Sequence, residues 1–134
     1  MSNYIAPSAR TGAPVYTTDS KLHGIWGTRA ANTLPLNAGD TLEIAKLPAG
    51  AMPVGVVLSV EAAADTTDAD VGIKGGDTDG FIDGANLNTT LVHYANGALI
   101  GAPLAAESVV LLTINTADLD DTIDVYWAIF YIMP

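Results

Sequence analysis

Six aspartates gather in the middle of the chain and form its densest group of carboxylates. Three of them, Asp77, Asp79 and Asp83, are spaced like part of a calcium-binding loop, in which carboxylates supply oxygen ligands to Ca²⁺. Alignment with an EF-hand loop fails at both ends, because Gly75 takes the first ligand position and Asn86 takes the position of the bidentate glutamate. The other interpretation is that Asp and Gly build tight turns in an exposed loop. We therefore expect no cofactor and no metal, with these three aspartates as the calcium candidates.

The residue types that nucleophilic or metal-dependent catalysis requires are sparse. Cysteine is absent, which excludes a thiolate nucleophile and a Cys-ligated zinc or iron–sulfur site. His23 and His93 are the only histidines and lie seventy residues apart, so only the fold could bring catalytic partners to them. No Gly-x-Ser-x-Gly, His-Glu-x-x-His or phosphate-binding glycine loop is present. The sequence predicts a protein that is not an enzyme, with an unrecognised hydrolase as one alternative.

Aromatic residues crowd into the last apolar stretch of the chain. Strand alternation sends Trp127 and Tyr131 to one face and Tyr126 and Phe130 to the other, and we expect Trp127 in the core. An exposed second face would be unusually apolar for a monomer. We therefore expect a neighbouring subunit or the N-terminal segment to cover it, which predicts a homo-oligomer, either a dimer or a trimer. The alternative is a central strand buried wholly within one chain.

Strand patterns fill the chain from Gly39 onward and would position these residues. Alternation of apolar and polar residues predicts strands over residues 41–46, 54–60 and 122–133. Short runs bounded by Gly, Asp or Asn predict strands over residues 71–73 and 91–94, and residues 109–114 are apolar on both faces, as in a central strand. The strands over residues 41–46 and 54–60, joined by a turn at residues 47–50, are predicted to pair as an antiparallel hairpin. Helical periodicity is almost absent. The predicted fold is all-β, an antiparallel β-sandwich or jelly roll with an extended N-terminal arm.

Residues 1–38 show no hydrophobic period, because prolines and glycines interrupt every candidate element. Their apolar side chains nevertheless need burial. We therefore predict two units, an extended arm over residues 1–38 and a β-sandwich body over residues 39–134, with the arm lying on its own body or on a neighbour. The predicted partner-binding residues are Tyr4, Ile5, Arg10, Tyr16, Leu22, Trp26 and Arg29 in the arm, and Tyr126 and Phe130 on the last strand.

The overall charge restricts the classes of partner. The chain has 134 residues, which suits one domain, and 15 acidic against 5 basic residues give a net charge of −10. Such a field repels phosphate backbones and anionic lipid headgroups, so we expect no nucleic-acid and no membrane partner. The first twenty residues lack the apolar centre of a signal peptide, and the longest apolar run is too short to cross a bilayer.

The charge is also unevenly distributed. The first 46 residues hold four bases against three acids, whereas the remainder holds Lys74 against twelve acids. This pattern predicts a mildly basic segment that lies on a partner and an acidic body that faces solvent. Chance asymmetry is the alternative.

The sequence resembles small structural proteins of tailed bacteriophages. The likeness lies in Gly39–Ala51 followed by a valine-rich strand, in the turn at Gly101–Ala106, and in the hydrophobic last strand. Proteins of this kind are often head decoration or cement proteins. The resemblance implies a sandwich or jelly-roll body on the outer surface of a virion capsid, bound to the major capsid protein and stabilising capsomer junctions without catalysis. The alternative is a carbohydrate- or receptor-binding module of a phage or bacterial surface, using Trp26, Tyr94 or the acidic loop with calcium.

Overall fold

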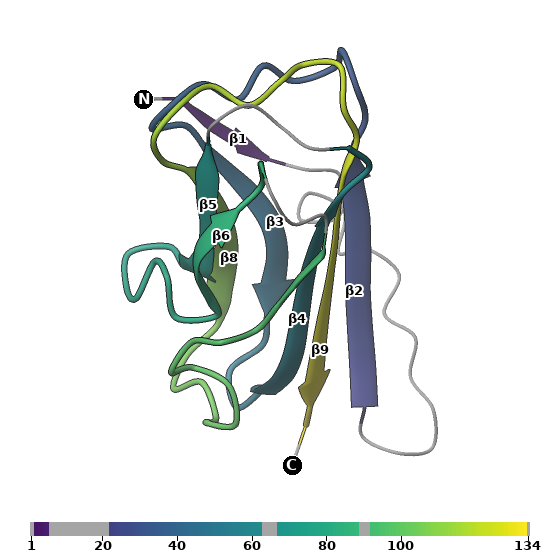
Figure 1. The fold of residues 1–134 in the computed structure, drawn as a ribbon. Helices are drawn as coiled ribbons and strands as arrows, with labels where there is room; N and C mark the ends of the chain where they lie inside the picture. Colours follow the sequence, from purple (N-terminus) through teal and green to yellow (C-terminus); the bar gives the residue numbers. More distant parts are fainter. Residues whose placement is uncertain (1, 6–21, 63–66, 89–91, 134) are drawn as a thin grey trace.

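The fold is a sandwich of two β-sheets (Figure 1). A computed structural model describes residues 2–5, 22–62, 67–88 and 92–133. These residues form nine strands and contain no helix that could span a bilayer. The predicted all-β sandwich is confirmed.

One sheet has five strands in the order β1-β3-β8-β5-β6. Their bounds in that order are β1 (Asn3–Ile5), β3 (Thr41–Leu47), β8 (Ser108–Ile114), β5 (Asp68–Ile73) and β6 (Ile82–Asn86). All neighbours are antiparallel except β1, which pairs in parallel with β3. The central position of β8 agrees with its two apolar faces. Residues 82–86 carried no strand pattern in the sequence, so β6 was not predicted.

The other sheet has four antiparallel strands in the order β2-β9-β4-β7. Their bounds in that order are β2 (Leu22–Arg29), β9 (Val125–Ile132), β4 (Met52–Val60) and β7 (Val92–Tyr94). Both β2 and β4 pair with β9 along its whole length. Because β9 is central, its alternating residues divide cleanly between the core and the outer surface.

The core lies between the two sheets and is built from the alternating inner residues of both. The sheet with β9 contributes Ile25, Val56, Leu58 and Ile129, and the other sheet contributes Leu42, Ile44, Val71 and Leu112, all at most 4% exposed. Trp127 is 3% exposed, which confirms its predicted place in this core. This stacking of two half-apolar sheets is how an all-β domain removes its apolar area from water.

The predicted hairpin between residues 41–46 and 54–60 is wrong. Both segments are strands, but β3 pairs with β1 and β8, whereas β4 pairs with β9 and β7. The turn between them carries the chain from one sheet to the other, with Gly50 at a φ of 84° and its N–H donating to the Leu104 carbonyl at 2.8 Å. Alternation shows which side of a strand is buried, but not which strand lies beside it.

The predicted boundary at residue 38 does not separate an arm from the body in the described residues. Strands β1 and β2 fall within residues 1–38, and each is hydrogen-bonded into a sheet. Glycines at positions 24 and 27 hid the alternation of β2, since they interrupt its apolar pattern. A chain beginning at Gly39 would therefore lack a full-length neighbour of β9. The rest of the predicted arm, residues 6–21, lies outside the described residues.

Arg29 is not a partner-binding residue, because it is only 2% exposed. Its Nη1 donates to the Ile123 carbonyl at 3.0 Å and its Nη2 to the Asp120 carbonyl at 3.2 Å, which holds the loop between β8 and β9. Burial lowers the pKa of Arg29, while Asp121, Asp120 and Asp124 oppose that shift. The guanidinium stays charged, because arginine is effectively always protonated in proteins. The arginine is thus a structural clamp at one end of the sandwich.

The opposite orientations of Trp127 and Tyr126 predict unequal stability losses. Replacing Trp127 with Ala should lower the free energy of unfolding by about 3–5 kcal/mol, since it leaves a cavity in the core. Tyr126→Ala removes a side chain that is 42% exposed and should cost less than about 1.5 kcal/mol. Denaturant unfolding of both variants measures the difference, and equal losses would contradict the assignment of the two faces.

Candidate functional site

The acidic loop between β5 and β6 folds back onto the outside of the five-stranded sheet. Gly72 lies beneath it, and a Cβ there would come within 2.2 Å of the backbone carbonyl carbon of Thr78. The Asp77 carbonyl accepts the Ile73 N–H at 2.8 Å and closes the loop on itself. Only glycine allows this close approach of two backbones. The loop is therefore a packed turn held by main-chain contacts.

The three calcium candidates are not brought together. Asp77 and Asp79 are neighbours, and hydrogen bonding with Asp77, reinforced by burial and by the charge of Asp77, raises the pKa of Asp79. Asp83 has its backbone N–H bonded to the Asn96 side chain at 3.0 Å. Within the described residues, no three His, Cys, Asp or Glu side chains form a group that could hold a metal ion.

The two histidines occupy opposite edge strands of the four-stranded sheet and serve separate contacts. The His23 ring stacks on Tyr131, with ring centroids 4.9 Å apart. The Nε2 atom of His93 lies 3.1 Å from the Asn86 carbonyl oxygen. Neither of these contacts joins a histidine to a nucleophile and an acid, so they do not support the hydrolase alternative.

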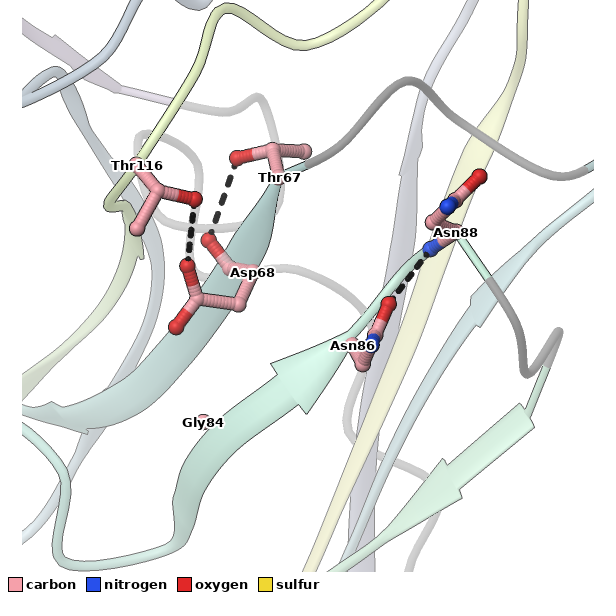
Figure 2. Close-up of a pocket in the computed structure, with 6 residues that line it drawn as sticks. All are labelled: Thr67, Asp68, Gly84, Asn86, Asn88 and Thr116. Carbon is pink, nitrogen blue, oxygen red and sulfur yellow. Dashed lines mark hydrogen bonds between the residues drawn. The ribbon is translucent and has the colours of Figure 1, made fainter.

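A polar pocket with a volume of about 380 Å³ opens at one end of the five-stranded sheet (Figure 2). It is lined by Thr67, Asp68, Gly84, Asn86, Asn88 and Thr116. Some of the polar groups that line the pocket bond to one another. Thr116 Oγ1 donates to Asp68 Oδ1 at 2.8 Å, and the Asn88 N–H donates to Asn86 Oδ1 at 3.0 Å. None of these lining residues is aromatic, so they offer no platform on which a sugar ring could stack.

Two carboxylates attach strand β1 to the sheet. Asp40 Oδ1 accepts the Ser2 N–H at 2.7 Å, and Glu43 Oε2 accepts hydrogen bonds from Asn3 Nδ2 and, at 2.8 Å, from Lys74 Nζ. The two side-chain hydrogen bonds lower the pKa of Glu43, and the backbone N–H groups of Ser2 and Asn37 lower that of Asp40. These buried carboxylates have a structural function.

The outer side of the four-stranded sheet presents large apolar side chains in register. One row across the sheet contains Trp26, Ala128, Val57 and Tyr94. The next row contains Thr28, Tyr126, Ser59 and Val92, and Phe130 lies between Gly24 and Gly55 in a third. We call this surface the aromatic face and define it by its exposed members Leu22, Trp26, Val92, Tyr94, Tyr126 and Phe130.

Exposure of the aromatic face is large for apolar residues. Tyr94 is 70% exposed and Trp26 is 48% exposed. On the last strand, Tyr126 is 42% and Phe130 is 37% exposed, so the interpretation in which this strand is buried wholly within one chain is wrong for the described residues. Contiguous apolar surface of this kind marks interaction sites in soluble proteins.

Two glycines seat the ring of Phe130 on the sheet. A Cβ at Gly24 would lie 3.2 Å from Phe130 Cε1, and a Cβ at Gly55 would lie 3.7 Å from Phe130 Cδ2. The ring thus covers backbone on both neighbouring strands; a Cβ at Gly24 would press against it, whereas one at Gly55 would make an ordinary van der Waals contact. Such packing of an aromatic ring over cross-strand glycines orders the side chain before any partner binds.

Charge is segregated between the two outer surfaces. Each outward residue in the paired rows of the aromatic face is uncharged. The outer side of the other sheet holds Glu43, Lys74, Asp70 and the acidic loop. The paired rows of the aromatic face therefore carry no charge, the carboxylates of Asp124 and Glu61 lie at its edge beside Tyr126, and the other sheet has an acidic outer side.

Apart from the buried Arg29, the predicted partner-binding residues divide into three groups. Leu22, Trp26, Tyr126 and Phe130 are exposed together on the aromatic face. Tyr4 and Ile5 are half-buried in β1, with Tyr4 packed against the core. Arg10 and Tyr16 lie outside the described residues. The predicted set omitted Val92 and Tyr94, although their alternation around His93 in a predicted strand was a usable signal.

Comparisons with known proteins identify related folds. No protein-family model matches the chain, and no curated protein matches it. A chain in the capsid of Ralstonia phage GP4 superposes with a TM-score of 0.78 at 18% identity, covering 98% of each chain. A chain of the cyanophage Pam1 capsid asymmetric unit gives a TM-score of 0.69 at 21% identity, covering 94% of each. A chain in the acid-stable capsid of Helicobacter pylori bacteriophage KHP30 gives 0.56 at 16% identity, covering 81% of this chain and 94% of that one. The fold is shared with these chains.

Asp40 and Glu43 predict that acid destabilises the protein. Their lowered pKa values mean that they stabilise the folded state fully above the ordinary carboxyl range, and that this contribution is lost as pH falls through the lowered values. The unfolding temperature should therefore drop between about pH 5 and about pH 3. Glu43→Gln should cost roughly 1–2 kcal/mol at pH 7, because Lys74 is half exposed, and should flatten the pH dependence.

The exposed Glu107 provides the control for this experiment. Glu107→Gln should retain both the stability and the pH profile of the unmodified chain. A Glu43→Gln variant with an unchanged slope of stability against pH would contradict the role given to Glu43.

The acidic loop should tolerate neutralisation. Asp77→Asn removes the negative charge that raises the pKa of Asp79, so the unfolding temperature at pH 7 should stay unchanged or rise by less than about 3 °C. Asp79→Asn should behave in the same way. Calorimetry with added calcium and with a chelator checks the loop, and a melting temperature that falls with chelator and recovers with calcium would refute the turn-building interpretation.

Proposed function

We propose that this protein is a structural component of a phage virion, and specifically a decoration or cement protein on the outer surface of the capsid. The observation that carries the proposal is the fold match over almost the full length of both chains with a chain of the Ralstonia phage GP4 capsid. Because the superposition covers 98% of each chain, the likeness is not confined to one part of the sandwich. The proposed partner is the major capsid protein.

The distribution of charge supports an outer location. A chain with a net charge of −10 is repelled by packaged DNA, whose backbone carries one negative charge per phosphate. The acidic side of the sandwich can face solvent while uncharged surface is buried in protein contacts. A cement protein acts by burying such surface across junctions between subunits, which requires shape and area but no chemistry.

Carbohydrate or receptor binding is supported less well. Trp26 and Tyr94 have exposed rings, but their neighbours in the same row are Ala128 and Val57. A glycan site needs polar groups that converge around an aromatic ring to bind hydroxyls. The polar pocket in Figure 2 has such groups without a ring.

Binding to phage heads tests the proposed function. Purified protein added to heads that lack it should sediment with them, reach a saturating ratio to the major capsid protein, and raise the temperature at which the heads disrupt. An unrelated acidic protein of similar size is the control for trapping. Protein on intact, DNA-filled heads should also be accessible to antibody. Failure to sediment with heads, or binding only after the heads are opened, would overturn the proposal.

A further inference from the structure

We propose that the aromatic face is the contact between copies of this chain, so that a second copy covers it. This contact would form in the isolated protein and does not depend on the capsid proposal. Three properties of the face support it: its area, its charge and the order of its side chains.

The area matches what a stable interface requires. From their exposed fractions, the six side chains of the aromatic face leave on the order of 700 Å² open to solvent, close to the about 800 Å² that each partner buries in a stable complex. Half-buried Met52, Val57 and Ile132 add apolar area along the same rows. Burial of this much aromatic surface supplies the main driving force of association.

The charge favours a copy of the same chain as the occupant. Two molecules that each carry −10 repel one another, and the repulsion is smallest when the uncharged rows of their aromatic faces meet, with Asp124 and Glu61 kept at the rim of the contact. Contact between copies through the acidic side would instead bring Asp70 and the acidic loop against like charges. An uncharged apolar face is complementary to itself, whereas a surface of one sign is not.

The order of the side chains lowers the cost of association. Phe130 is already held over Gly24 and Gly55, and the Tyr126 hydroxyl donates to Asp124 Oδ2 at 3.1 Å. Aromatic side chains that are placed before binding lose little rotamer freedom when a partner covers them. The face is therefore organised for rigid contact.

The first test is the oligomeric state of the purified chain. Sedimentation equilibrium between 1 and 100 µM should show a dimer or a trimer that persists in 1 M NaCl, because apolar contacts are not screened by salt. Trp26→Glu and Tyr94→Glu should each weaken association at least tenfold, since a carboxylate would be buried without a partner. Ala105→Glu adds the same charge to an exposed turn outside the strands and should leave association unchanged.

Tryptophan fluorescence gives a second readout on the unmodified chain. Trp127 is buried, so acrylamide should report mainly on Trp26, which should be protected in the oligomer and quenched after dilution below the dissociation constant. Trp26→Phe should abolish that change.

A monomer at 100 µM, or an oligomer that survives both glutamate substitutions in folded variants, would overturn the proposal. Equal weakening by Ala105→Glu would overturn it too, since charge alone would then explain the effect. If a glutamate variant fails to fold, Tyr94→Ser on the short strand β7 decides in its place. A monomer that binds heads through this face would identify the shell as the occupant and would refute self-association without affecting the proposed function.

Discussion

Hydrogen bonding of β9 along both of its edges is the constraint on which the rest of the molecule depends. With β2 on one side and β4 on the other, β9 cannot shift its register without moving both neighbours. Trp127, Ile129 and Tyr131 are consequently committed to the core, and Tyr126 and Phe130 to the outer surface. The apolar core and the aromatic face are therefore two results of a single pairing arrangement, and neither can be altered independently of the other.

Polar groups complete the sandwich at its ends. The Arg29 guanidinium donates hydrogen bonds to carbonyl groups of the loop that leads into β9, which fixes where that strand begins. Asp40 accepts a hydrogen bond from the Ser2 N–H, and Glu43 accepts one from the Asn3 side-chain amide. These two bonds fix where β1 lies against β3. Each of these buried charges has hydrogen-bonding partners, as groups removed from water require. They explain how this acidic chain buries charged groups in its folded state.

The sequence predicted the fold class and the two-sided character of the last strand, because alternation in a half-buried strand reports directly on burial. It did not predict the strands that pair with β3 and β4. The apolar residues of an inner face show the same alternation whether the next strand along the chain pairs with it in the same sheet or packs against it from the opposite sheet. It also missed β2, where glycine replaces the apolar side chains that would have marked a strand. The glycine at position 24 has a physical reason in the structure, because the ring of Phe130 lies over it. Tyr94 was named only for the carbohydrate- or receptor-binding alternative, and its place in the same row as Trp26, on the opposite edge of the sheet, depends on the pairing of four strands.

The pairing of β2 with β9 joins residues roughly 100 positions apart, so it closes one of the longest loops that the chain can form. During synthesis β2 and β4 are made before residues 125–132. The backbone groups on the edges that pair with β9 therefore lack their strand partner until that segment is made. Only then are Trp26, Phe130 and Tyr94 assembled into one surface. The aromatic face is therefore absent from any chain in which β9 has not yet paired with β2 and β4.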